Sequence, residues 1–164
     1  MGTRQVEVQR FSLVSTRRFA EVIGALEAAI GHPEMNAFRR DLTTAATSAD
    51  LERAVGEAAG TSGLMEFARF DIGAVLRLHQ GEQAARSLRL VVGNPVIMKQ
   101  MVEHVPDAAS YAPVTLLIDE RPDGVHLSYD RMASFLAPYG NAAALKVARD
   151  LDAKVEKLLA KVAG

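Results

Sequence analysis

The 164-residue sequence contains no cysteine and no tryptophan, and it has only three tyrosines and six phenylalanines. The lack of cysteine excludes disulfides, thiol catalysis and cysteine-ligated zinc. Because about half of the residues are nevertheless apolar, Leu, Val, Ile, Ala and Met must supply the core. A chain of this length buries about 68–70% of its unfolded surface and needs no covalent or metal staple. We expect one domain spanning residues 1–164.

The sequence also lacks an excess of charge, since 19 basic and 20 acidic side chains give a net charge of −1. Nucleic-acid binding normally needs a basic face, so no nucleic-acid partner is expected. No apolar run approaches the roughly 20 residues that span a bilayer, and residues 1–6 contain no apolar signal core. We therefore expect no membrane span and a cytoplasmic location.

Apolar periodicity divides the chain into short strands and amphipathic helices. The expected strands are residues 5–14, 64–71, 87–92, 114–118 and 125–129. The expected helices are residues 19–30, 72–78, 95–104, 131–135 and 141–162, with further helices in an insertion at residues 32–60. This order predicts an α+β fold with a small mixed or antiparallel sheet of four to five strands. We expect helices mainly on one face, including a long C-terminal helix.

Polar residues at the expected helix starts predict the caps of those helices. Asn94, Asp130 and Asn141 each precede a helix, and Thr47 with Asp50 has the spacing of a capping box. The sequence Arg-Pro-Asp-Gly at 121–124 is a strong turn signal between two apolar runs. It predicts a β-hairpin over residues 114–129.

An ordered set of motifs between Leu90 and Tyr129 is similar to that of one known family. A strand ends in Gly-Asn-Pro at 93–95, Ala-Pro at 112–113 enters an apolar strand, and Gly124 precedes Ser-Tyr-Asp at 128–130. This combination resembles the bacterial family catalogued as domain of unknown function 302, most closely over residues 64–140 and loosely over 4–30. The resemblance implies a small α+β fold with a mixed four-stranded sheet, helices on one face and dimeric members. It implies no activity.

Two features depart from the pattern of that family. Its members commonly carry an Asp-His pair at the end of the second strand, where this sequence has Asp71-Ile72. A role of that histidine therefore does not transfer to this chain. The segment 32–60 is also longer than the usual connection, and we expect it to cover a surface that other members leave open.

The junction Gly93-Asn94-Pro95 is the main candidate for a functional site. A helix start exposes N–H groups and a partial positive charge that attract anions, and Gly93 lets another group approach the backbone closely. The alternative is that Asn94 and Pro95 merely start the helix, because both residue types favour those positions. The junction lacks the other glycines of a dinucleotide loop and the lysine of a P-loop.

Arg69, Asp71, His126 and Tyr129 complete the hypothesised pocket, which would hold a small anionic or apolar ligand. The leading hypothesis is a non-enzymatic ligand-binding or accessory protein that acts as a homodimer. One alternative is an enzyme of unrecognised type that uses Asp71, His126 or His104 for acid–base chemistry. Another is a protein–protein interaction module. No catalytic residue is assigned.

The four histidines show no HExxH motif and no paired spacing, so the sequence predicts no zinc site and no evident cofactor. Met98, Met101 and His104 share one expected helix, and a haem or soft-metal site built from them is the alternative. The plainer interpretation is that both methionines fill the core. His104 would then lie at the solvated end of the helix, where its charge suits the helix dipole.

Overall fold

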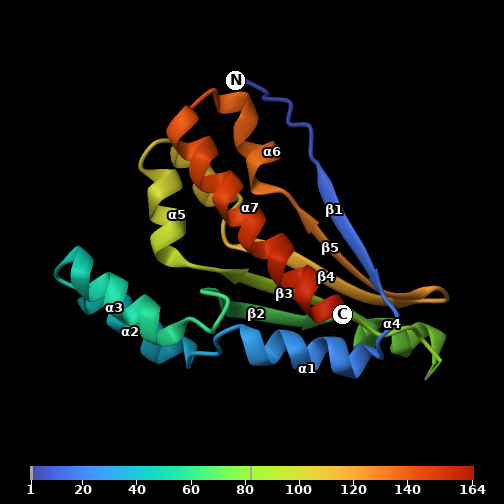
Figure 1. Ribbon diagram of the computed structural model, residues 1–164. Helices are drawn as coiled ribbons and strands as arrows, with labels where there is room; N and C mark the ends of the chain where they lie inside the picture. Colours follow the sequence, from blue (N-terminus) through green and yellow to red (C-terminus); the bar gives the residue numbers. More distant parts are fainter. Residues whose placement is uncertain (1, 82) are drawn as a thin grey trace.

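The centre of the molecule is a sheet of five strands (Figure 1). A computed structural model describes residues 2–81 and 83–164. The strands are β1 (Arg10–Ser15), β2 (Met65–Asp71), β3 (Ser87–Gly93), β4 (Val114–Arg121) and β5 (Gly124–Asp130). Their order is β1-β5-β4-β3-β2, and each neighbouring pair is antiparallel. The predicted α+β fold is confirmed, but five antiparallel strands replace the four-stranded mixed sheet that the family resemblance implied.

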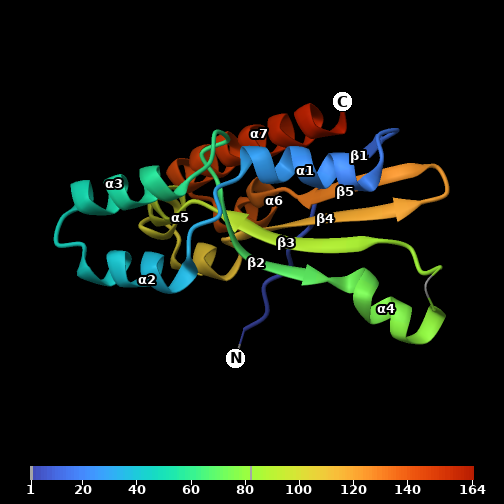
Figure 2. The same ribbon diagram turned by 90° about the horizontal axis from the view of Figure 1, so that it is seen from below.

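The described residues form seven α-helices, and α1, α6 and α7 lie on one face of the sheet (Figure 2). The long C-terminal helix is confirmed as α7, which packs against α1, α5 and α6. Asn141 caps it as predicted, because its Oδ1 accepts a hydrogen bond from the backbone N–H of Ala144. The helices are α1 (Phe19–Ala29), α2 (Met35–Thr44), α3 (Ser48–Ala58), α4 (Ile72–Gln80), α5 (Pro95–Val102), α6 (Met132–Leu136) and α7 (Ala142–Ala163).

The core lies between the sheet and α7. Val125, Leu127 and Tyr129 of β5 point into it, and the intervening His126 and Ser128 belong to the opposite face. α7 covers these side chains with a buried stripe at helical spacing that includes Ala148, Leu151, Val155, Leu158 and Val162. The predicted hairpin is confirmed, since β4 and β5 pair from Leu116↔Tyr129 to Arg121↔Gly124.

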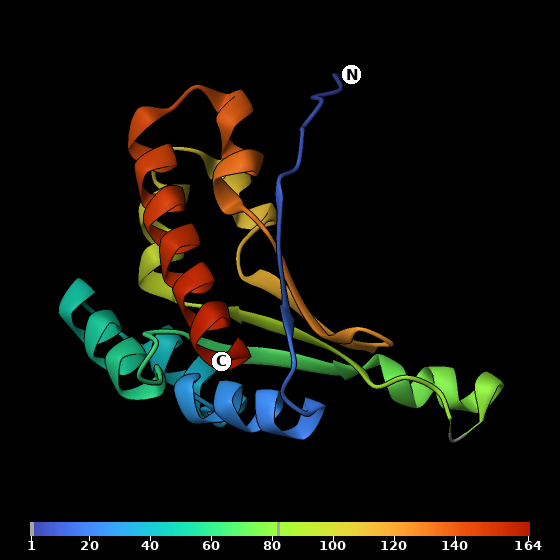
Figure 3. The same cartoon turned by 45° about the vertical axis from the view of Figure 1, so that its right-hand side comes forward.

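The predicted helical insertion is a hairpin of α2 and α3 that projects beside the start of β2 (Figure 3). The predicted capping box is present, with Thr47 and Asp50 bonded reciprocally at the start of α3. Phe38 of α2 and Val55 of α3 form a second core cluster with Met65 of β2. The insertion is thus held to the sheet by its own apolar contacts.

The chain enters and leaves the insertion at a crossing of two glycines. A Cβ atom on Gly31 would lie 1.9 Å from the carbonyl oxygen of Ala58, and one on Gly60 would lie 2.4 Å from that of Ala29. Both glycine N–H groups donate to the carbonyl oxygen of Leu64. Only residues without a side chain allow the backbones to approach this closely.

Two local predictions are wrong. The first strand begins at Arg10 rather than at residue 5, because the alternation in residues 5–9 has no sheet partner to bury it, and Val8 is exposed. Asp130 does not cap α6, since its carboxylate instead forms a two-bonded ion pair with Arg10. Among the described residues, no helix is long and apolar enough to cross a membrane.

Candidate functional site

The junction between β3 and α5 satisfies its own backbone groups. Asn94 caps α5, since its Oδ1 accepts hydrogen bonds from the N–H groups of Val96 (2.9 Å) and Ile97 (3.2 Å). Pro95 has no N–H, and the N–H of Met98 donates to the carbonyl oxygen of Asn94 (3.0 Å). Of the four N–H positions that this helix start leaves unpaired, residues 94–97, two are thus bonded by Asn94 and the third is a proline without an N–H. This arrangement matches the interpretation in which Asn94 and Pro95 start the helix, and the N–H groups of Val96 and Ile97 already have their acceptor.

An apolar cavity of about 260 Å³ lies beside this junction. Met98 and Met101 of α5 and Leu151 of α7 form part of its wall. The remaining lining residues are Leu42, Phe67, Gly93, Asn94, Pro95, Ile97, Ala112, Pro113 and Val114. Asn94 supplies the one polar side chain, and its amide also donates to the carbonyl oxygen of Gly63 at 2.9 Å. The cavity therefore presents carbon surface almost everywhere.

Gly93 allows the segment before β4 to approach the cavity. A Cβ atom on Gly93 would lie 3.0 Å from the Cβ of Pro113 and 3.5 Å from Cε2 of Phe67. The expectation that Gly93 permits a close backbone approach is thus met, and the approaching group is Pro113 of the same chain. A larger residue at position 93 would push this wall of the cavity outward.

A β-bulge in β2 brings the insertion to the cavity. The register with β3 shifts between Glu66 and Ala68, which leaves Phe67 as the extra residue. Phe67 packs edge-to-face against Phe38 of α2, with ring centroids 6.4 Å apart. Leu42, one turn further along α2, also lines the cavity. The insertion therefore contributes to a wall that the sheet and α5 alone do not close.

The structure does not bring Asp71 or His126 to this cavity. Gly93 pairs with Met65 at the start of β2, whereas Asp71 ends that strand, roughly 20 Å away at the rise of a strand. Asp71 caps α4 through a 2.8 Å hydrogen bond from the N–H of Ala74. His126 lies three strands from Asp71, about 14 Å at the usual spacing, and contacts Asp123.

Tyr129, another predicted pocket residue, lies inside the core rather than at the cavity. Its hydroxyl donates to Oδ1 of Asp152 at 2.6 Å. The same carboxylate accepts from the N–H groups of Met132 (2.7 Å) and Ala133 (3.1 Å), so Asp152 of α7 caps α6 from outside that helix. Burial raises the pKa of Asp152, although the hydrogen bonds from Tyr129, Ala133 and Met132 lower it.

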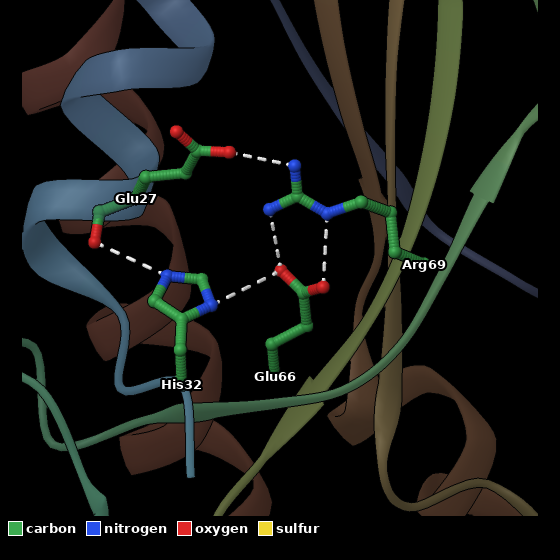
Figure 4. Close-up of polar contacts among 4 residues, drawn as sticks. All are labelled: Glu27, His32, Glu66 and Arg69. Atoms are coloured by element: carbon green, nitrogen blue, oxygen red, sulfur yellow. Dashed lines mark hydrogen bonds and ion pairs between the residues drawn. The ribbon is translucent and has the colours of Figure 1, made fainter. Parts of the chain in front are cut away.

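Arg69 belongs to a separate polar cluster between β2 and α1 (Figure 4). Its guanidinium binds both oxygens of Glu66 (2.9 and 2.8 Å) and reaches Oε1 of Glu27 (2.6 Å). His32 lies 3.6 Å from Glu66 and bonds to the carbonyl oxygen of Glu27. The hydrogen bond to Glu66 raises the pKa of Arg69. Every polar group of the cluster faces another, which is typical of an anchoring ion-pair network.

The methionines of the proposed soft-metal site line the cavity, but His104 does not. Met98 and Met101 are in its wall, whereas His104 follows the end of α5 and is exposed. Within residues 2–81 and 83–164, no three histidine or acidic side chains gather in an arrangement suited to a metal ion.

Comparison with protein families gives a match over residues 40–162, three quarters of the chain, to the domain of unknown function DUF302. The chain belongs to the DUF302 family. The match extends beyond the residues that carried the resemblance, since it includes most of the insertion and nearly all of α7.

A solved DUF302 structure has the same fold. The crystal structure of an uncharacterized conserved protein DUF302 from Bacillus stearothermophilus superimposes with a TM-score of 0.65 at 10% sequence identity. The match covers 93% of this chain and 97% of that one. Because residues 32–60 make up more than a sixth of this chain, such a match includes part of the insertion. No curated protein matches the sequence.

The sequence patterns of this DUF302 chain did not predict the buried Asp152 or the polar cluster around Glu66. Asp152 stands among the apolar positions of α7, and a carboxylate on a buried helix stripe is a signal for a fixed polar partner. The cluster had a weaker signal, namely the spacing of Met65, Phe67 and Phe70, which changes from two to three. Such a change within a strand indicates a bulge, and this one places Glu66 and Arg69 on one face.

Proposed function

We propose that this DUF302 protein binds a small apolar molecule in the cavity beside the β3–α5 junction. The observation that carries the proposal is the composition of the cavity wall, which is formed by aliphatic, methionine and aromatic side chains from five separate segments of the chain. Convergence of distant apolar segments around an open space is typical of ligand pockets. Flexible methionines such as Met98 and Met101 adapt to ligands of different shape.

The chemistry of the cavity favours an apolar ligand over an anionic one. Oδ1 of Asn94 is bonded to the N–H groups of Val96 and Ile97 in α5, and its side-chain amide donates to the carbonyl oxygen of Gly63. The other side chains of the cavity wall are apolar. The volume of about 260 Å³ is slightly below the usual range of about 300–1,000 Å³ for drug-sized ligands. An apolar cavity of about 150 Å³ accommodates benzene. The expected ligand is therefore larger than one aromatic ring, such as a medium-length acyl chain.

Calorimetric titration with 1-octanol and with octanoate tests this proposal. Saturable binding of 1-octanol is expected, with weaker binding of octanoate because burying its carboxylate against an almost entirely carbon surface is costly. Leu42→Trp would place a larger side chain in the cavity wall and should weaken binding about tenfold or more. The matched control is Leu51→Trp, at a half-buried position of the same insertion that does not line the cavity.

Provided that the wild type and both variants are folded, three results would overturn the proposal. One is the absence of saturable binding by either compound. Another is equal weakening by the two tryptophan variants. The third is tighter binding of octanoate than of 1-octanol, which would favour the anionic ligand. Circular dichroism and thermal melting of both variants establish that they are folded.

We also propose that the protein acts as a homodimer through a patch on β2 and α4, here called the α4 patch: Phe70, Ile72, Val75 and Leu78. These four are among the large apolar side chains that the described chain exposes, and Leu78 is 82% exposed. α4 projects from the end of β2 away from the insertion (Figures 2 and 3). The patch carries both Asp71 and Arg77 at its border, so two-fold contact with a second copy can place opposite charges across the interface.

Sedimentation equilibrium of Val75→Glu/Leu78→Glu tests the dimer. The wild-type chain is expected to sediment as a dimer and the double variant as a monomer, since buried unpaired carboxylates oppose association. Val8→Glu introduces a charge at an exposed apolar residue outside the patch and should leave the dimer intact. A monomeric wild type, or a double variant that remains dimeric, would contradict this interface.

A further inference from the structure

A second hollow, of about 640 Å³, lies between α7 and the loop that leads into β2. Three lysines of α7, Lys154, Lys157 and Lys161, line it from one side. Thr61 and Ser62 line it from the loop. We call it the lysine groove. It shares no lining residue with the apolar cavity.

The three lysines have no carboxylate within ion-pair distance in the described part of the chain. Most other cations do, for example Arg86 with Glu120 and Arg131 with Glu156. Their spacing of three and four residues puts the ammonium groups on one helix face, where like charges repel. Among the described residues that line the groove, only Asp150 is acidic, and it is already bonded to Lys146 at 2.8 Å. The groove therefore concentrates positive charge on a chain whose net charge is −1.

The helix dipole accounts for only part of this charge. A cation is stabilised by the dipole within the last turn of a helix, and the effect fades beyond it. α7 ends at Ala163, so Lys161 lies in its last turn. Lys157 and Lys154 lie in earlier turns, where the dipole gives them little stabilisation. The helix dipole therefore does not explain why Lys154 and Lys157 line the same hollow as Lys161.

The loop facing the lysines adds hydroxyl groups. The hydroxyl oxygen of Ser62 accepts a hydrogen bond from the N–H of Leu64 at 3.3 Å, which leaves its proton free to donate. Lys154 lies against this loop, since a Cβ atom on Gly63 would be 3.2 Å from its Nζ. Ammonium and hydroxyl donors thus face the same hollow from two elements.

We propose that the lysine groove binds a small molecule bearing two or more phosphate groups. Lysine ammonium groups and serine or threonine hydroxyls are common phosphate ligands in proteins. The volume is in the usual range of about 300–1,000 Å³ for small-molecule sites. Nucleic acid is disfavoured because the basic surface is a single hollow and not an extended track. The site is independent of the proposed apolar cavity, so either can fail without the other.

Calorimetric titration with inorganic pyrophosphate and orthophosphate tests the lysine groove. At about 20 mM ionic strength, one pyrophosphate is expected to bind per chain and orthophosphate more weakly, with both weakened at about 150 mM salt by screening. Lys154→Gln/Lys157→Gln should weaken pyrophosphate binding about tenfold or more. The control Arg53→Gln/Lys99→Gln removes the same charge at residues outside the groove and should change affinity less than about twofold.

The proposal is overturned if pyrophosphate shows no saturable binding, or if the two double variants weaken it equally, since the latter means only nonspecific charge attraction. Parallel titrations use vesicles of anionic phospholipid and a short single-stranded RNA. Lysine-dependent binding of either one without pyrophosphate binding would also overturn it. All four lysine and control positions are on the surface of helices, so the variants are expected to fold, and thermal melting checks this.

Discussion

The hydroxyl of Tyr129 donates a 2.6 Å hydrogen bond to Oδ1 of Asp152, 23 positions further along the chain and inside the core. Through this contact and two backbone hydrogen bonds, α7 fixes both the end of β5 and the start of α6. Buried polar groups need such partners, and a carboxylate with three donors is a strong constraint on how α7 lies across the sheet.

Asp152→Ala is expected to be among the most destabilising single changes in the chain. It leaves the Tyr129 hydroxyl and the N–H of Ala133 without their acceptor, and the N–H of Met132 keeps only its longer 3.2 Å bond to the Tyr129 hydroxyl oxygen. Each unsatisfied buried donor costs about 1–3 kcal/mol. We expect a loss of about 3 kcal/mol or more. Tyr129→Phe removes the hydroxyl, which donates to Asp152 and accepts from Met132, but it leaves both backbone N–H groups bonded to Asp152. About 1 kcal/mol is therefore expected. Urea unfolding measures both, and a smaller loss for Asp152→Ala than for Tyr129→Phe would contradict this assignment.

The raised pKa of Asp152 predicts a specific dependence of stability on pH. When burial raises the native pKa above the unfolded value of about 3.9, the native state binds more protons between the two values. The free energy of unfolding should therefore fall as pH rises from about 4 through the native pKa. Asp152→Asn cannot ionise and should lack this slope. Urea midpoints of both proteins between about pH 4 and pH 7 give the comparison. If the free energy of unfolding of the wild type instead rises with pH relative to that of Asp152→Asn, the native state favours the ionised form of Asp152.

Gly60→Ala should destabilise the attachment of the insertion, because its methyl group would overlap the backbone of residues 29–31. Overpacking typically costs about 1–3 kcal/mol, and rigid backbone neighbours put this site at the upper end. Gly56→Ala is the control, since that glycine lies in α3 with open space around it. It should stabilise by up to about 1 kcal/mol through helix propensity. Thermal unfolding measures the change in stability of each variant. If both variants are destabilised, or both are stabilised, the result contradicts the glycine crossing.

Gly93→Ala should alter the cavity more than the fold. Its methyl group would meet Pro113, whose Cβ lies 3.0 Å from that position, and must displace this wall. We expect binding of 1-octanol to weaken several-fold while the protein stays folded. Gly24→Ala, in α1 with no atom within 4 Å of the added methyl, should bind like the wild type. Unchanged affinity in Gly93→Ala would show that Pro113 is not part of the binding wall.

The sequence predicted the elements well where one local pattern determined them. Asn94, Asn141 and the Thr47–Asp50 pair cap the helices they precede, because capping is a contact between near neighbours. Asp130 shows the limit, since it is a good cap by type and position but its carboxylate is taken by Arg10, 120 residues away in sequence. Capping propensity depends on neighbouring residues and therefore does not predict an ion pair with a residue far away in sequence.

The candidate site could be predicted only in part. The Gly93-Asn94-Pro95 junction does border the cavity, but Leu42, Ala112 and Leu151 reach it from distant parts of the chain. Nothing in their local sequence shows that they converge. Asp71 and Tyr129, like the junction, lie near strand ends, and the sequence does not show which strand ends meet at one edge of the sheet. The antiparallel order instead puts Asp71 at the other end of the sheet and Tyr129 beneath α7.

The central claim is that the cavity beside α5 holds an apolar ligand, and methyl NMR tests it most directly. In protein labelled at the methionine methyl groups, bound 1-octanol should give intermolecular NOEs to Met98 and Met101, which line the cavity. Met35, Met65 and Met132 are not among the lining residues and should give none. NOEs confined to Met98 and Met101 are the predicted result. Their absence at saturating 1-octanol, or their appearance at the other methionines instead, would contradict the account.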